Sequence, residues 1–370
     1  MPYPPYFNRA WQLTIDTADG NHYRVRSLVA SDEEPLRISF NTTAYIQQSY
    51  WLADITVYNL RHQKAPLGHQ DEATELTCDQ RILSGDVVSL SAGYDDGHGS
   101  FSATKGLIFA GRVFQPVWTR QNVVDYTLKL RCICGLTEDT LNLLSFAKSA
   151  GATHYATLED AVTRAGAKLD IDARAAEALQ NTTYGRAQVF HTKPDDLVRE
   201  ITKQSNLFFW NTPAVGPDGK STVMVRSFVD RPTTPDLMYG PSGYDPNEAT
   251  GFDLAAATVP GLKALRASAL RPTLIGTPEQ TQDGVRFRVL IDSDIRIGAV
   301  IQLAKGTILN PFLMAPLKTY PQVSAREGLF VVAGYSHVGD SRGRGGDWYT
   351  EVTGLLWNFF PSLFAANTPS

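Results

Sequence analysis

Apolar and polar residues alternate with period two over most of the first 135 residues, which predicts strands with one buried face. Trp11–Asp16 and His22–Arg26 both alternate, and the Asp19-Gly20 pair between them supplies a turn, so the two segments predict a hairpin. The longest alternating run is Val123–Ile133. Further strands are predicted at residues 36–40, 53–58, 85–90 and 107–113. A series of strands with few helices is typical of a β-sandwich or a barrel.

The pattern becomes helical in the middle third of the chain. Thr137 is placed to cap a helix that begins at Glu138 and carries the apolar residues Leu141, Leu144 and Phe146. Further helices are predicted at residues 158–164, at 173–179 and from residue 194 onward, with strands at 207–210 and 222–226. The middle of the chain is therefore expected to form a small α+β region.

Period two returns after Pro232–Asn247, a polar stretch rich in glycine and proline that is typical of a connection. Strands are predicted at residues 284–291, 300–303 and 348–352. The expected fold is mainly β, with two similar β-barrel domains flanking a small α+β region. The expected boundaries are residues 1–135 for the first β domain, 136–260 for the α+β insertion, and 261–370 for the second β domain with a C-terminal extension.

The two β-rich ends resemble each other in sequence order as well as in composition. Gly106–Val113 matches Gly328–Tyr335 if one inserted residue is allowed, and the offset of 222 residues recurs between Asp125 and Asp347. Upstream, 85–90 parallels 298–303 at an offset of 213 residues. An internal duplication explains these ordered matches, and it places Phe109 opposite Val331. The alternative is that generic hairpins resemble one another.

Composition narrows the class of protein. Hydrophobic residues make up 43% and charged residues 19%, which is typical of a globular chain and not of a disordered one. Lys and Arg number 34 against 38 Asp and Glu, so the strongly basic balance of a dedicated nucleic-acid binder is missing. Three cysteines cannot build a disulfide framework. The sequence contains no apolar run of the roughly 18–20 residues that a membrane span needs, and its start lacks the features of a signal peptide.

Motifs for catalysis or cofactor binding are weak. His62 and His69 share a loop with Asp71 and Glu72, which is either a metal cluster or, more simply, a solvated loop. The Gly219-Lys220-Ser221 segment lacks the upstream glycine and the following helix of a phosphate loop. Gly93–Gly99 could cradle an ion, but it is also an ordinary hairpin connection. We therefore predict no catalytic, cofactor-binding or metal-binding residue and no cofactor.

The strand pattern resembles the phage tail baseplate hub family. The residues that carry the resemblance at the N-terminal end are 36–40, 55–60, 85–94 and 107–113. At the other end, Gly328–Val338 followed by Trp348–Gly354 is similar to the last strands of the same family. The resemblance covers nearly the whole chain loosely, as a pattern of strands without a catalytic signature.

The resemblance implies a structural, non-enzymatic protein with two tube-like β barrels per chain, related to the hub domains of type VI secretion spike proteins. It implies a homotrimer that presents six similar units to the tail tube protein and three-fold symmetry to the central spike protein. Other baseplate proteins would be neighbours, in a contractile injection system. DNA would pass through the channel without specific binding, past a neutral to acidic wall. The implied location is the virion tail baseplate, assembled in the host cytoplasm.

Two other functions remain open at this point. The chain could be another tail ring protein, tube-initiating or distal, or a tail enzyme that degrades cell wall or capsule.

Six residues are candidates for partner binding. Pro361 ends regular strand pairing, so the apolar side chains near it either cover the chain's own barrel or bind a neighbouring chain or the spike. Two arginines lie in the flexible segment Gly339–Asp347, which is either an ordinary loop tip or a contact with a partner or a phosphate. The candidates are Phe359, Phe360, Leu363, Phe364, Arg342 and Arg344.

Overall fold

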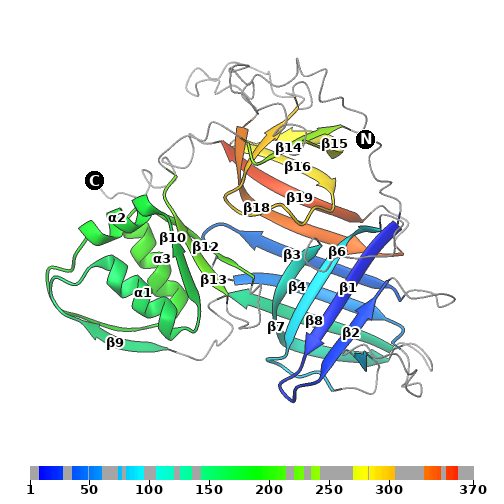
Figure 1. Ribbon diagram of the computed structural model, residues 1–370, viewed down its shortest axis with the longest axis horizontal. Helices are drawn as coiled ribbons and strands as arrows, with labels where there is room; N and C mark the ends of the chain where they lie inside the picture. Colours follow the sequence, from blue (N-terminus) through cyan, green and yellow to red (C-terminus); the bar gives the residue numbers. More distant parts are fainter. Residues whose placement is uncertain are drawn as a thin grey trace. The chain divides into compact units, whose positions relative to one another are not determined.

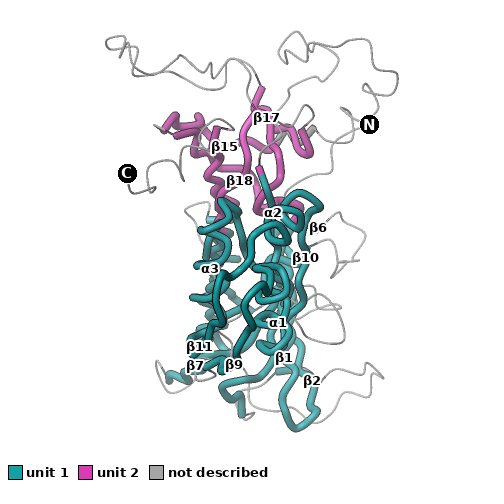
Figure 2. The backbone as a smooth tube through the Cα atoms, turned by 90° about the vertical axis from the view of Figure 1, so that its left-hand side faces the viewer, with its two compact units in different colours: residues 1–227, 337–348 teal, residues 228–336, 349–370 magenta. Residues whose placement is uncertain are grey.

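The computed structural model divides the chain into two compact units, residues 1–227 with 337–348 (unit 1) and residues 228–336 with 349–370 (unit 2) (Figure 2). A short piece from late in the chain thus belongs to unit 1, although both its flanks belong to unit 2. The structure describes residues 8–27, 36–48, 50–60, 74–76, 81–95, 106–120, 126–135, 143–213, 221–228, 235–241, 270–281, 283–304, 329–342 and 347–356.

The sheet of unit 1 is formed by the N-terminal part of the chain. Its strands are β1 (Asn8–Asp16), β2 (His22–Arg26), β3 (Ile38–Tyr45), β4 (Tyr50–Tyr58), β5 (Thr74–Glu75), β6 (Val87–Asp95), β7 (Leu107–Arg120) and β8 (Tyr126–Gly135). They lie in the order β3-β4-β8-β7-β6-β1-β2-β5. All neighbours are antiparallel except β2 and β5. The predicted hairpin of β1 and β2 is confirmed.

One face of this sheet is buried, as the period-two pattern predicts. On β8, Leu128 and Cys132 are completely buried while Lys129 and Arg131 between and beside them are exposed. On β1, Trp11 is 1% exposed and anchors the same apolar core. Burial of such large side chains is the main stabilising contribution to a sheet of this kind.

The α+β region also belongs to unit 1. Its helices are α1 (His154–Arg164), α2 (Ala173–Asn181) and α3 (Pro194–Gln204), and they pack against one face of a three-stranded sheet (Figure 1). That sheet has the order β10-β13-β12, and a separate two-stranded sheet pairs β11 with β9. The strands are β9 (Leu144–Lys148), β10 (Lys168–Ile171), β11 (Gln188–Thr192), β12 (Phe208–Thr212) and β13 (Thr222–Arg226).

The ends of these helices follow local capping rules. The Thr153 hydroxyl accepts a 3.1 Å hydrogen bond from the Ala156 amide and caps α1, and the Asp172 carboxylate caps α2. Pro194 occupies the first turn of α3, as the sequence predicts. The Gln47 amide donates a 2.7 Å hydrogen bond to the Phe209 carbonyl, which ties β12 to the turn after β3.

The predicted helix around Leu144 and Phe146 is wrong, because both residues lie in strand β9. Residues two apart share a strand face, so the two apolar side chains fit a strand as well as a helix. Phe146 is paired in register with Phe190 of β11, and the two rings lie 5.1 Å apart over the core of the α+β region. This distant pairing decides the conformation. Thr137 and Glu138 lie outside the described residues.

Unit 2 is built from a circuit of strands. The strands are β14 (Leu237–Pro241), β15 (Leu270–Gln280), β16 (Gly284–Leu290), β17 (Val300–Leu303), β18 (Leu329–Asp340) and β19 (Trp348–Leu356). Their order is β17-β14-β15-β16-β19-β18, and an additional pairing of β17 with β18 returns the order to its start. The final residues of β18 and the first of β19 extend into unit 1.

Strand β14 corrects a second expectation, since it lies within the polar stretch 232–247 that is typical of a connection. It is parallel to both β15 and β17 and stands between them. Tyr239 of β14 is completely buried, and its hydroxyl donates a 2.9 Å hydrogen bond to the Asp292 carboxylate. The predicted fold class, mainly β with an α+β insertion, is confirmed. Among the described residues, no helix has the length and apolar character required to cross a membrane.

Candidate interaction site

The internal repeat predicted from sequence has a structural counterpart. Gly85, with φ +96°, donates a 2.8 Å hydrogen bond to the Val113 carbonyl, and the Val113 amide donates back to the residue after the glycine. Gly298, with φ +82°, makes the same pair of bonds with Val332 at 2.9 Å each. A positive φ favours glycine, which explains why each copy begins with this residue. Strands β6-β7 therefore correspond to β17-β18.

The neighbouring strands extend the correspondence. β3-β4-β8 and β15-β16-β19 share the same order and the same antiparallel pairing. At their starts, Leu36-Arg37-Ile38-Ser39-Phe40 and Leu270-Arg271-Pro272-Thr273-Leu274 follow one pattern of leucine, arginine, any residue, hydroxyl and apolar residue. Single-sequence reasoning missed this match, although the pattern is visible in the sequence.

The register of the repeat differs from the prediction. Phe109 and Val331 do lie on corresponding strands, β7 and β18. However, Val300 pairs with Val331, and its counterpart Val87 pairs with Arg112. Arg112 therefore occupies the position of Val331, three residues from the predicted match. Asp125 lies outside the described residues, so its match with Asp347 stays a prediction.

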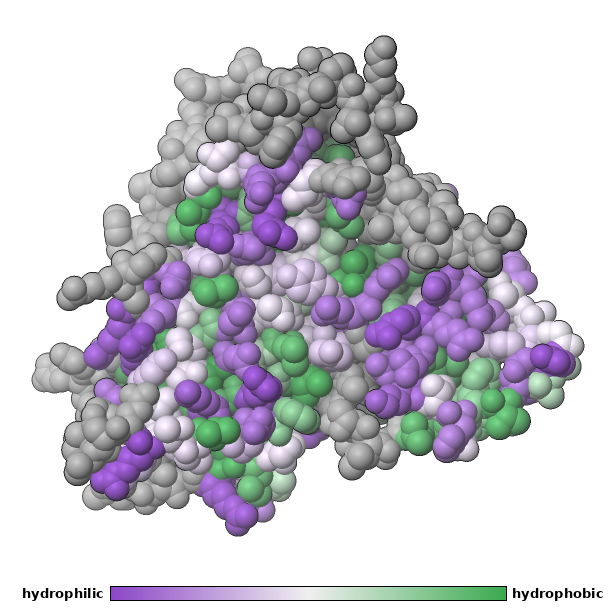
Figure 3. Space-filling view, turned by 180° about the vertical axis from the view of Figure 1, so that it is seen from behind, coloured by the Kyte–Doolittle hydropathy of each residue, from purple (hydrophilic) through white to green (hydrophobic). Residues whose placement is uncertain are grey.

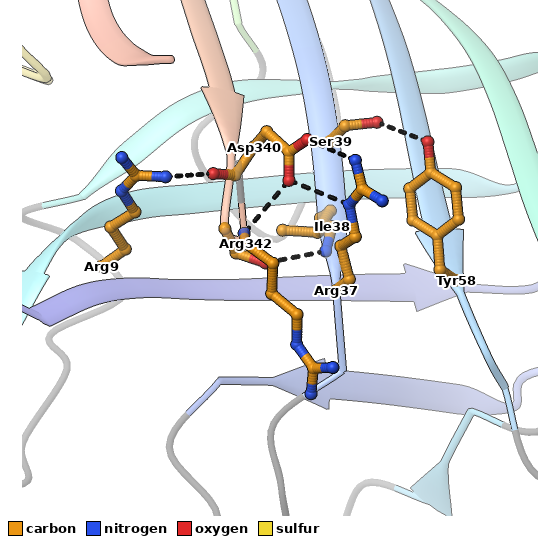
Figure 4. A network of polar contacts seen from close by, with 8 residues as sticks. Arg9, Arg37, Ile38, Ser39, Tyr58, Asp340 and Arg342 are labelled. Atoms are coloured by element: carbon orange, nitrogen blue, oxygen red, sulfur yellow. Dashed lines mark hydrogen bonds and ion pairs between the residues drawn. The ribbon is translucent and has the colours of Figure 1, made fainter. Parts of the chain in front are cut away.

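The turn between β18 and β19 is bound to the sheet of unit 1 by a polar network. We call residues His337–Trp348 the hairpin tip. Its Asp340 carboxylate accepts two hydrogen bonds from the Arg37 guanidinium, from Nε at 3.0 Å and from Nη2 at 2.6 Å (Figure 4). The Arg9 guanidinium of β1 donates to the main-chain carbonyl of Asp340. The bidentate geometry suits a planar guanidinium and a carboxylate, and these bonds raise the pKa of Arg37 although burial opposes them.

Main-chain contacts continue along β3. The Ser341 amide donates to the Ile38 carbonyl at 2.9 Å, and the Ile38 amide donates to the Ser341 hydroxyl at 3.0 Å. Two residues along, Gly339 lies against Phe40 so closely that a Cβ on the glycine would be 2.3 Å from the ring. Ile38 thus faces Ser341 and Phe40 faces Gly339, so β3 and the end of β18 run in opposite directions.

Trp348 fixes the other side of the hairpin tip. It is 2% exposed, and its ring packs edge-on against Phe40 with centroids 5.2 Å apart. Its indole N–H donates a 3.0 Å hydrogen bond to the Gly93 carbonyl of β6, and the Tyr94 hydroxyl donates to the Trp348 carbonyl. The hairpin tip therefore contacts β3 on one side and β6 on the other. In the first copy of the repeat it occupies a place between these strands similar to the place of β14 between β15 and β17.

The predicted site residues are only partly accounted for. Arg342 is exposed in the hairpin tip, and its amide donates a 3.1 Å hydrogen bond to the Asp340 carboxylate. The other five candidates, Arg344, Phe359, Phe360, Leu363 and Phe364, lie outside the described residues, so their role in partner binding stays a prediction. Arg37 and Asp340 were missed because 303 residues separate them and a single sequence does not indicate that they meet.

Chemistry-bearing residues do not gather in the described part of the chain. No group of three or more His, Cys, Asp or Glu side chains arranged to hold a metal ion occurs there. His62 and His69 lie outside it. Cys132 and Cys134 are free, share the buried face of β8, and burial raises the pKa of the Cys132 thiol. A buried neutral thiol is a core side chain and a poor nucleophile.

Two exposed ion pairs occupy matching positions in the two copies. Asp54 of β4 and Arg131 of β8 are direct cross-strand partners, with an N–O distance of 3.2 Å. Arg288 of β16 and Glu351 of β19 are direct partners at 2.8 Å, with the charges reversed. The exposed faces of the two copies thus each carry locally compensated charge.

These features define a class: a mainly β chain whose strand pattern is repeated around an α+β insertion is the fold of phage tail proteins and of type VI secretion spike proteins. The chain superposes on a 43 kDa tail protein of prophage MuSo2 from Shewanella oneidensis with a TM-score of 0.50 and 9% identity, covering 94% of this chain and 99% of that one. The VgrG protein of a lidless PdpA–VgrG complex gives a TM-score of 0.51 and 9% identity, with 95% of this chain covered and 65% of that one.

A third match is a type VI secretion component of Escherichia coli that is described as structurally similar to the T4 bacteriophage tail proteins gp27 and gp5. It aligns at a TM-score of 0.48 and 8% identity over 88% of this chain and 75% of that one. No protein-family model and no curated protein matches the sequence. At these identities the likeness establishes the fold, and the resemblance noted from the strand pattern is confirmed at that level.

Proposed function

We propose that the protein is the structural hub of a phage tail baseplate, a homotrimeric adaptor between the six-fold tail tube and the three-fold central spike. The observation that carries the proposal is the internal repeat, with matching glycine hydrogen bonds, matching strand order and matching ion pairs in the two copies. A chain with two similar β units supplies six units in a closed ring of three. The repeat thus resolves the symmetry mismatch between tube and spike.

The proposal assigns parts of the chain to this role. Residues 1–135 and 261–370 are the two tube-like domains and residues 136–260 the insertion. The tail tube protein contacts one end of the ring, and the central spike protein the other. Other baseplate proteins bind at the periphery. The location is the virion tail baseplate, after assembly in the host cytoplasm.

The same ring encloses the channel through which DNA leaves the tail. A strongly basic wall would retain DNA through the release of counterions. The paired charges on the exposed faces of both copies support a wall that DNA passes without specific binding. The protein is proposed to be non-enzymatic, since the fold likeness is to tail and spike proteins. An internal repeat also favours a hub over a tail ring protein with one β unit per chain.

Light scattering tests the assembly. The chain, mixed with its tail tube and spike proteins, is expected to give a complex that contains three copies. A chain that remains monomeric both alone and with these partners contradicts the proposed function.

The C-terminal aromatic residues form a second part of the proposal. Phe359, Phe360, Leu363 and Phe364 are proposed to bind a neighbouring hub chain or the spike, because each large apolar side chain gains roughly 1.5–3 kcal/mol on burial. Truncation after Asn358 is expected to abolish assembly while leaving the melting temperature unchanged. A large fall in the melting temperature of the isolated chain would instead assign the segment to its own barrel.

A further inference from the structure

We propose that the outer half of β7 in one copy of the chain docks on β15 of a second copy, as the hairpin tip docks on β3 within one chain. We call Phe114–Arg120, the part of β7 beyond Val113, the β7 overhang. The inference rests on the trimeric function proposed above and names the surfaces that join its chains.

The two docking partners are identified by the repeat. Val113 and Val332 make the same hydrogen bonds with a glycine, so the β7 overhang corresponds to β18 beyond Val332, which leads into the hairpin tip. β15 corresponds to β3, because the two share their leucine–arginine start and their place beside β16 and β4. Each copy of the repeat therefore has one protruding hairpin and one receiving strand. Within the described residues, only one of the two possible unions is made.

The β7 overhang lacks the cover that its counterpart has. In the end of β18, His337 is 1% exposed and Gly339 is packed on a phenylalanine ring. None of the residues of the β7 overhang is buried, and its Phe114 and Val117 are 51% and 40% exposed. Among the described strands, β7 beyond Val113 is paired with β8 alone.

The outer part of β15 shows the same deficit. Along β3, alternate residues are buried from Ile38 to Ala44. Along β15, the pairing with β14 stops at Leu274, and the next three residues are exposed, with Ile275 at 38%. The protruding half of one copy and the receiving half of the other therefore both leave apolar side chains in water.

A second copy is the occupant that fits these surfaces. The β7 overhang and β15 differ from each other but match the two sides of an existing junction, so their union is heterologous and repeats from chain to chain until the ring closes. The exposed apolar residues are scattered among polar ones on the face drawn in Figure 3, which offers no broad apolar patch among the described residues there. Pro116 and Pro278 remove main-chain donors from the two strands. They limit pairing to this partner, as edge prolines commonly do.

The repeat also predicts which residues meet. Counting from Val113 and Val332, Thr119 corresponds to Val338. Counting from the shared leucine–arginine start, Ile275 corresponds to Asn41. Since Phe40 faces Gly339 and the strands are antiparallel, Asn41 faces Val338. Thr119 of one chain should therefore lie opposite Ile275 of the next.

Cross-linking between two separate chains tests this contact. One chain carries Thr119→Cys, the other carries Ile275→Cys and a different affinity label, and both carry Cys78→Ser. A short bismaleimide is expected to join the two chains when they are mixed with the spike and tube proteins. The matched control replaces Ile275→Cys by Leu143→Cys, on a residue that is 52% exposed in the α+β region, and no cross-link is expected.

A second pair of variants measures the contribution to assembly. Phe114→Asp combined with Val117→Asp is expected to abolish the three-copy complex without changing the melting temperature, while Leu143→Asp assembles normally. If the unmodified chain forms trimers but the cross-link is absent and the double variant assembles, the inference is wrong and the proposed function stands. If the unmodified chain forms no trimers at all, both are wrong.

Discussion

Trp348→Ala is expected to lower the free energy of unfolding by about 3–5 kcal/mol, the range for removing a buried tryptophan from a packed core. The side chain is 2% exposed, packs on Phe40 and donates to the Gly93 carbonyl, so truncation leaves a cavity and an unpaired acceptor in the same place. The measurement is urea denaturation of the purified chain.

The matched control for this variant is Phe114→Ala, because Phe114 is also aromatic but is 51% exposed in the single chain. Its effect on the unfolding of the monomer is expected to stay within about 0.5 kcal/mol. A loss below about 1 kcal/mol for Trp348→Ala would show that the hairpin tip is not held in the sheet of unit 1.

Stability is also expected to fall as the pH drops from 7 to 4, by about 3 kcal/mol through His337 alone. His337 is 1% exposed, and burial lowers its pKa to about 3. The unfolded chain, in which the histidine pKa is about 6.5, therefore binds a proton that the folded chain excludes between these two values. Its neutral form leaves stability unaffected above pH 7, and the loss grows as the pH falls toward 3.

His337→Gln separates this contribution from those of the carboxylates and of His154, whose pKa burial also lowers. Chemical denaturation at pH 7 and at pH 4 is expected to show a smaller pH-dependent loss in the variant, by about 3 kcal/mol. Equal losses in the variant and the unmodified chain would mean that His337 is protonated in the folded state.

Local patterns predicted the elements whose side chains have one environment. β8 alternates because one face is buried, and α3 begins at Pro194 because a proline there has no helical donor to lose. β9 was predicted as a helix because Leu144 and Phe146 satisfy both periods, and only the pairing with β11 distinguishes them. β14 was missed because its stability comes from two parallel neighbours that are distant in sequence.

The candidate site was less predictable for the same reason. Arginine and aspartate at strand ends are ordinary surface residues until Arg37 and Asp340 meet across 303 residues. The repeat itself was visible, yet its register was not, because glycine-led strands of similar composition align at several offsets. The hydrogen bonds of Gly85 and Gly298 decide the register.

Electron microscopy of the hub assembled with its spike and tube proteins tests the central claim most directly. The account predicts a ring of three chains in which six similar β units surround one channel, alternating between the first and second copy of the repeat. A ring with one β unit from each of six chains, or one in which the two halves of the chain have unrelated strand orders, would contradict it.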